Sequence, residues 1–167
     1  LLGLAFLFIE MSFIQKFILF LSHPLYSVAV VLAGFLVFAG LGSVFSSRLF
    51  SSPVYAVAGI ALISLAYIIL LPGLFDRLIG LDDVFKAAIS LALIAPLAFC
   101  MGMPFPLGLK SVAAHEAGFI PWAWGINGFA SVISAALATL LAIQLGFTAV
   151  LLMALVLYLL SVLLFRR

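Results

Sequence analysis

The chain has 167 residues, of which 68% are hydrophobic and only 7% are charged, and its formal net charge is +2. So few charged side chains cannot cover the surface of a water-soluble globule, which excludes that class and indicates a protein embedded in a lipid bilayer. The sequence also offers no motif or basic surface typical of proteins that bind nucleic acid.

Charged residues divide the sequence into long uncharged stretches at 17–47, 49–75, 87–109 and 117–165. A transmembrane helix needs about 20 apolar residues, so the first three stretches hold one span each and the last holds two. Residues 1–22 supply one more. We therefore predict an all-α membrane protein, a bundle of about six transmembrane helices. The expected helices lie near 1–22, 25–47, 54–71, 84–103, 122–143 and 147–165.

Residues 1–167 are expected to form a single polytopic membrane domain. The chain opens on Leu1 rather than on methionine, and no basic segment precedes a signal-peptide cleavage site. We therefore expect this domain to belong to a longer polypeptide.

Glu10 is the most informative residue of the first helix, because a charge near the middle of a span costs roughly 2.5–3.5 kcal/mol. Lys16 lies about 120° around that helix and ~9 Å along it, so a direct pair with Glu10 is not expected. Glu10 therefore needs a partner on another helix, a water-filled cavity or a proton. It is either a functional carboxyl or an acid that fixes helix packing. We expect Gln15 to hydrogen-bond a neighbouring helix and Lys16 to reach the interface.

The next segments are interpreted mainly as packing and turn elements. His23 precedes Pro24 in the first turn and is expected to be a turn residue rather than a ligand. The glycines of the second helix, among them Gly34, Gly40 and Gly42, indicate a close crossing or a bend. A Pro-Gly pair at 72–73 is expected to end the third helix before an interfacial turn or short helix.

Prolines bracket the segment 104–121, whose central residues around Lys110 predict a short helix at the cytoplasmic face. Trp122 and Trp124 follow, at a depth where indole rings anchor helices to the interface. Asn127 lies one turn inside the fifth helix and either bonds another helix or contacts a ligand. Small residues at three- and four-residue spacing in that helix predict that it is buried in the bundle.

Basic residues favour the cytoplasmic side of a membrane. With six spans, Arg48, Lys110 and the terminal pair Arg166 and Arg167 fall on the same side. We therefore predict that both termini are cytoplasmic.

The sequence offers no catalytic site, no metal site and no cofactor motif. Cys100 is the only cysteine, and His115 and Glu116 without a third ligand do not make a metal site. Common hydrolase, nucleotide-binding and dinucleotide-binding motifs are missing. Any enzymatic chemistry is expected to lie outside this chain.

Four local patterns carry a resemblance to a known family. They are E-x-x-x-x-Q-[KR]-F at 10–17, H-P at 23–24, G-M-P-F-P-L-G at 102–108 and W-x-x-N-G at 124–128. The chain resembles the membrane portion that follows the aminopropyltransferase-like domain in large bacterial polytopic spermidine synthase-like proteins.

The resemblance implies a bacterial inner-membrane domain attached to a cytoplasmic, soluble nucleotide-binding-type domain, with further membrane helices as other candidate partners. This membrane domain would anchor the soluble one and exchange a polyamine-like or other small cationic ligand with it. Under this interpretation Glu10, Gln15 and Asn127 face the bundle interior as one polar cluster. Two alternatives stay open: half of a proton- or cation-coupled secondary transporter, and a purely structural membrane subunit.

Overall fold

Helices are the only regular secondary structure over the residues that the computed structural model describes, which are 1–50 and 52–165. Arg166 and Arg167, on which part of the orientation prediction rests, lie outside the described residues. The helices are α1 (Leu2–Leu21), α2 (Pro24–Leu49), α3 (Pro53–Leu78), α4 (Asp83–Met101), α5 (Pro104–His115), the 3-10 turn η1 (Ala117–Phe119), α6 (Ile120–Leu145) and α7 (Phe147–Phe165).

Six helical stretches are long and apolar enough to cross a bilayer, with α4 and α5 counted together as the stretch Asp83–Ala114. The predicted all-α bundle of six spans is therefore confirmed, and the chain is an integral membrane protein by the length and composition of its helices. The short helix expected in 104–121 is present as α5, where Pro104 and Pro106 occupy the first turn, a position that tolerates proline.

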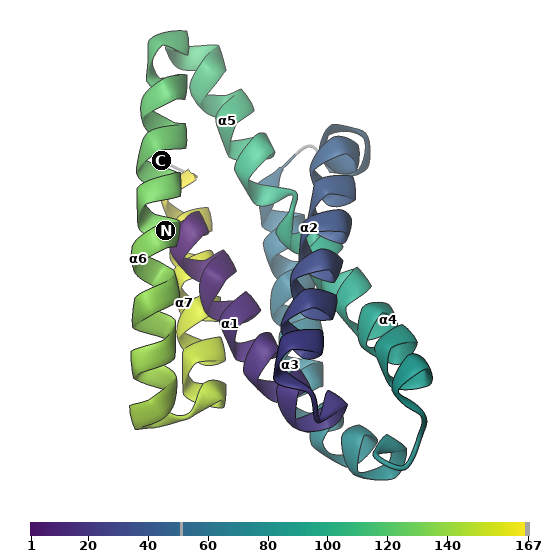
Figure 1. The fold of residues 1–167 in the computed structure, drawn as a ribbon. Helices are drawn as coiled ribbons and strands as arrows, with labels where there is room; N and C mark the ends of the chain where they lie inside the picture. The colour runs from purple at the N-terminus through teal and green to yellow at the C-terminus, as the bar shows by residue number, and fades with distance from the viewer. Residues whose placement is uncertain (51, 166–167) are drawn as a thin grey trace.

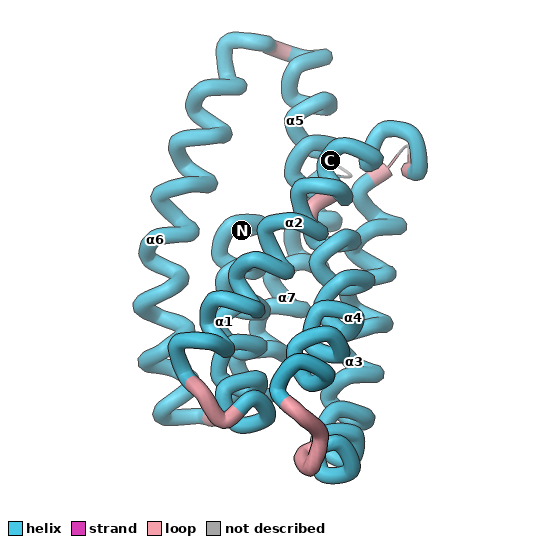
Figure 2. The backbone as a smooth tube through the Cα atoms, turned by 45° about the vertical axis from the view of Figure 1, so that its right-hand side comes forward, coloured by secondary structure: helices cyan, strands magenta, loops and turns pink. Residues whose placement is uncertain are grey.

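α1 is the central helix of the bundle. It packs against α6 and α7 on one side and against α2 on the other, while α4 packs against both α2 and α3. Figure 1 shows α1 crossing between these two groups, and Figure 2 shows α6 at one edge of the molecule. More than half of α1 is buried, the largest share of any span in the described chain. The residues of α1 therefore hold the two groups together.

The packing of α2 against α4 depends on glycine. A Cβ atom on Gly42 would lie 1.9 Å from the Phe99 carbonyl oxygen, and one on Gly102 would lie 1.9 Å from the Ala39 carbonyl oxygen. Small residues let two backbones approach this closely where no hydrophobic force drives helices together. The close crossing predicted from the glycines of the second helix is confirmed.

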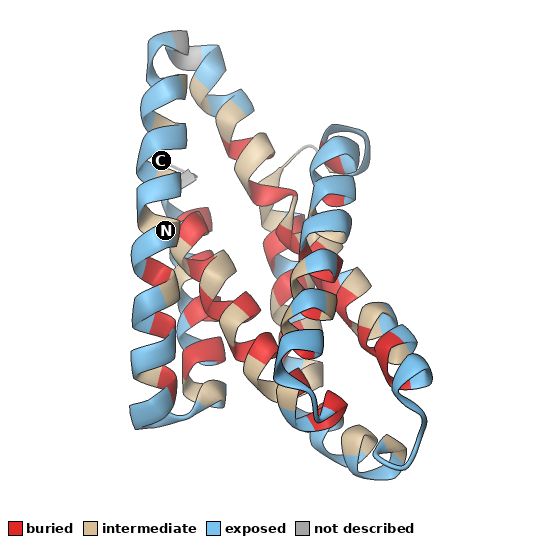
Figure 3. Ribbon diagram, in the orientation of Figure 1, coloured by how far each residue is buried: buried red, intermediate tan, exposed pale blue. Residues whose placement is uncertain are grey.

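The prediction that the fifth helix is buried is wrong. α6 lies at the edge of the bundle and has the smallest buried share of the described spans, and most of its ribbon is pale blue, the colour of exposed residues, in Figure 3. Its fully buried residues are Ser134, Ala138 and Ala142, spaced four apart along one stripe. A stripe of small residues marks one contact face, and the rest of α6 is apolar and suited to lipid.

Ser134 on this stripe donates a hydrogen bond of 2.7 Å to the Leu4 carbonyl oxygen of α1. Ser134→Ala is expected to lower the free energy of unfolding by about 0.6–1.7 kcal/mol, the range of interhelical hydrogen bonds in membranes. Thr139→Ala is the control, because Thr139 is exposed and bonds only its own helix, at Ala135. Equal losses for both variants in a mixed-micelle unfolding titration would contradict a specific α6–α1 bond.

The prediction that Pro72 and Gly73 end the third helix is also wrong. α3 continues through both residues to Leu78. Proline leaves the carbonyl oxygen four residues earlier without its N–H donor, and membrane helices tolerate this because neighbouring helices or local backbone adjustments satisfy the freed group. A proline-glycine pair ends helices in water more reliably than in a membrane span.

Candidate functional site

A cavity of about 460 Å³ lies where α1, α2, α4, α5, α6 and α7 approach one another. We call it the polar cavity, because uncharged polar side chains line part of its apolar wall. Its lining residues include Gly3, Ser43, Gly102, Phe105, Trp124, Asn127, Ser131 and Tyr158. Asn127 is about 10 Å along α6 from Ile120, whereas Leu2 and Gly3 are the first residues of α1, so the polar cavity lies at the level where α1 begins.

Tyr158 places the most unusual polar group in this wall. The side chain is 1% exposed, and its hydroxyl has no hydrogen-bond partner among the described residues. A buried hydroxyl without a partner costs about 1–3 kcal/mol. Almost none of the surface of this hydroxyl is accessible, so a bound molecule can satisfy it only after a local rearrangement of the wall.

Asn127 and Ser131 add polar atoms from α6. The Ser131 hydroxyl donates to the Asn127 carbonyl oxygen at 2.9 Å, which leaves the lone pairs of the hydroxyl oxygen able to accept. α1 approaches closely here, because a Cβ atom on Gly3 would meet the Asn127 carbonyl oxygen at 2.5 Å and the Ser131 hydroxyl oxygen at 2.6 Å. Gly3 therefore lets α1 cover these groups.

The break between α4 and α5 forms another part of the wall. α4 ends at Met101 and α5 begins at Pro104, with Gly102 and Met103 between them. Pro106 has no N–H to donate to the Gly102 carbonyl oxygen four residues earlier, and no hydrogen bond to that oxygen is found in the described part of the chain. Non-helical backbone inside a membrane protein is tolerated where protein buries it or where it lines a cavity.

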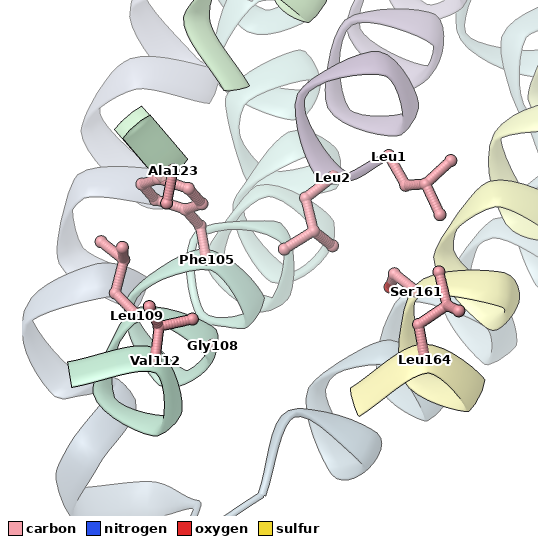
Figure 4. Close-up of a pocket in the computed structure, with 9 residues that line it drawn as sticks. All are labelled: Leu1, Leu2, Phe105, Gly108, Leu109, Val112, Ala123, Ser161 and Leu164. Atoms are coloured by element: carbon pink, nitrogen blue, oxygen red, sulfur yellow. The ribbon is translucent and has the colours of Figure 1, made fainter. Parts of the chain in front are cut away.

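A second cavity, of about 290 Å³, lies beside the polar cavity, and the two share Leu2 and Phe105. We call it the end cavity, because Leu1 and Leu164 both line it. Figure 4 shows the side chains of Leu2 and Phe105 approaching the space from different helices. Since Leu1 and Leu164 border one space, the two described ends of the chain lie at the same end of the bundle.

Phe105 and Trp124 connect the two segments that form this region. Their rings meet edge to face with centroids 5.0 Å apart, which joins α5 to α6. Both tryptophans are exposed, but Trp124 lines the polar cavity and Trp122 borders outer pockets near Phe119 and Ile126. The two tryptophans, predicted together as interfacial anchors, thus occupy different surroundings.

Glu10, Gln15 and Asn127 do not lie together. Asn127 is beside Gly3, which is about 10 Å along α1 from Glu10, and Gln15 is about 8 Å further. Glu10 is 5% exposed and does not line the polar cavity. No hydrogen bond or ion pair of its carboxyl is found among residues 1–50 and 52–165. Only Asn127 of the three belongs to the polar cavity.

The interfacial residues predicted from the sequence lie at both ends of the bundle. Lys16 is half-buried and borders a pocket with Asp76. His23 is the residue before the first turn of α2, its side chain makes no capping bond, and its Nε2 atom lies 3.7 Å from Asp83 Oδ2. At the other end Lys110 of α5 donates to the hydroxyl of Ser47 in α2. That contact joins α5 to α2 near the polar cavity.

Two residues of interest were missed by the sequence reasoning. Lys86 in the first turn of α4 is buried, with its ammonium nitrogen 5.9 Å from the centroid of the Phe20 ring. The four-residue spacing of Lys86, Ser90 and Ile94 is the signal that could have found it. Tyr158 gave no such signal, because α7 is apolar on every face.

The fold and its cavities define the class of protein: a six-span integral membrane protein with a partly polar cavity beside a broken helix. Comparison with protein-family models, with curated proteins and with solved structures finds no match for this chain.

Proposed function

We propose that this chain is the membrane domain of a polytopic spermidine synthase-like protein, and that it exchanges a small ligand with an attached soluble domain. One observation carries the proposal. The segments 102–108 and 124–128, two of those on which the resemblance rests, both line the polar cavity and touch through Phe105 and Trp124. Segments separated in sequence that meet at one cavity support a shared role in binding.

The charge distribution supports placing this end of the bundle in the cytoplasm of a bacterial cell, at the inner membrane. Lys110 reaches Ser47 beside Arg48, at the end where both described chain ends lie. The opposite end carries Arg77 and Lys86 among the acidic residues Asp76, Asp82 and Asp83, so the orientation also depends on the terminal pair Arg166 and Arg167 of the sequence. With this orientation the end cavity, which Leu1 and Leu164 line, lies toward the side where a soluble nucleotide-binding-type domain works.

Exchange through the polar cavity differs from a transport mechanism that depends on Glu10. In a proton- or cation-coupled carrier the coupling carboxyl lies at the substrate site near the midplane. Glu10 is separate from the polar cavity, which favours ligand exchange at Asn127 over coupling at Glu10.

Proteoliposomes loaded with labelled spermidine test this function. Asn127→Ala is expected to slow spermidine exchange at least tenfold, because a lost hydrogen bond to a charged group is worth about 1.5–3 kcal/mol. Glu10→Gln, the matched control within the membrane, is expected to leave exchange near the parent rate. Loss of exchange in Glu10→Gln with normal exchange in Asn127→Ala would instead support the carrier interpretation.

The complete coding sequence tests the family assignment separately. We expect it to encode an aminopropyltransferase-like nucleotide-binding domain, fused to the membrane domain. A coding sequence with an unrelated domain, or with none, would remove the assignment even if spermidine exchange were observed.

A further inference from the structure

We propose that the polar cavity binds the ammonium head of an extended organic amine, through uncharged oxygen atoms at the α4–α5 break and on α6 and α7. The choice of amines among possible ligands rests on the proposed function. The existence of the site rests on Tyr158, the broken helix and the size of the cavity.

The size of the polar cavity indicates an organic ligand. Its volume of about 460 Å³ falls in the range of small-molecule sites and far exceeds the roughly 30 Å³ that one water occupies. Most of its wall is apolar, with leucine, phenylalanine and proline side chains. A ligand with a hydrocarbon body and one polar head therefore fits better than a bare metal ion.

Hydrogen-bond acceptors line the polar cavity on α6 and α7. The lone pairs of Ser131 Oγ are available because its hydrogen is donated to Asn127, and the Asn127 side chain adds an amide oxygen close to it. The oxygen of the Tyr158 hydroxyl, which has no partner among the described residues, is a further acceptor on α7. A primary ammonium has three N–H donors and can bond more than one of these oxygens.

The α4–α5 break adds a further preference for positive charge. Gly102 lies at the carboxyl end of α4, where the helix dipole is equivalent to about half a negative charge. The Gly102 carbonyl oxygen has no helical N–H donor, because Pro106 four residues later has no N–H. Carbonyls at the ends of broken membrane helices coordinate cations in the same way in secondary transporters.

The described residues that line the polar cavity include no lysine, arginine or histidine and no aspartate or glutamate. The wall therefore offers a counter-ion to neither sign of charge, and the preference for a cationic head rests on the oxygen acceptors and on the carboxyl end of α4. The methylene chain of an amine can continue past Leu2 and Phe105 into the apolar end cavity, which both residues also line.

Equilibrium dialysis of the full-length protein in lipid nanodiscs tests this assignment with two probes of equal chain length, 1,8-diaminooctane and 1,8-octanediol. The diamine is expected to bind at least tenfold more tightly than the diol. Equal binding of the two probes would overturn the preference for an amine and indicate a neutral amphiphile.

Tyr158→Phe removes only the hydroxyl and separates binding from folding. It is expected to weaken diamine binding about tenfold, the loss of one charge-assisted hydrogen bond. The same variant is expected to raise the melting temperature of the empty protein, because the unsatisfied hydroxyl is gone. Tyr55→Phe is the control, since Tyr55 is exposed on α3 and does not line the polar cavity.

Asn127→Ala is a second, independent variant, and it is also expected to weaken diamine binding about tenfold. Diamine binding that is unchanged in both Tyr158→Phe and Asn127→Ala would overturn the site. If spermidine exchange persists and Tyr158→Phe leaves diamine binding unchanged, the site is overturned but the proposed function is not. Tyr158-dependent binding in a protein whose gene encodes no aminopropyltransferase-like domain would support the site and remove the family assignment.

Discussion

Gly42→Ala is expected to lower the free energy of unfolding by about 3 kcal/mol, at the upper end of what overpacking costs. The added Cβ atom would lie 1.9 Å from the Phe99 carbonyl oxygen, and the obstacle is backbone rather than a flexible side chain. α2 and α4 must therefore separate along the crossing. Unfolding of the purified protein in mixed detergent and SDS micelles measures the loss.

Gly40→Ala is the matched control on the same helix, because nothing lies within 4 Å of a Cβ atom at that position. Alanine favours a helix over glycine by about 1 kcal/mol, so this variant is expected to be neutral or more stable. Similar losses in the Gly40 and Gly42 variants would show that the close crossing of α2 and α4 does not exist as described.

Glu10→Leu is expected to raise the free energy of unfolding by about 3 kcal/mol at neutral pH, the cost assigned to a charged residue at the centre of a span. Glu10 is buried in the central helix, and the described residues provide its carboxyl with no ion pair or hydrogen bond. Leucine keeps the contacts with neighbouring helices and removes the polar group.

Glu10→Gln is the companion variant in the same unfolding titration, and it is expected to gain less than Glu10→Leu because the amide is still polar. A loss of stability in Glu10→Leu would mean that the Glu10 carboxyl has a stabilising partner, either another residue of the protein or a bound ligand. That outcome would restore Glu10 as a candidate functional carboxyl.

The six spans could be predicted from the sequence because the bilayer dictates their length and hydrophobicity, and the positions of the charges separate them. The close crossing of α2 and α4 was predictable for a similar reason, since glycine marks the places where backbones approach. The lateral position of α6 was not, because small residues mark a contact face without giving its width. The course of α3 through Pro72 depended on the apolar surroundings of the helix rather than on local sequence.

The candidate site could be predicted only in part. Asn127 was identified because a polar amide beside two glycines is unusual in a span. Its neighbours in the polar cavity come from helices distant in sequence, and nothing in the sequence pairs Tyr158 of α7 with Asn127 of α6. Glu10 and Gln15 were grouped with Asn127 by polarity alone, and the rise along α1 separates them.

A crystal structure of the full-length protein in a lipid phase, determined with and without spermidine, tests the central claim most directly. We predict density for an extended molecule in the polar cavity, with its head within hydrogen-bond distance of the Tyr158 hydroxyl and the Asn127 side chain. A cavity that holds a lipid chain in both crystals, or that is closed by Trp124, would contradict the assignment.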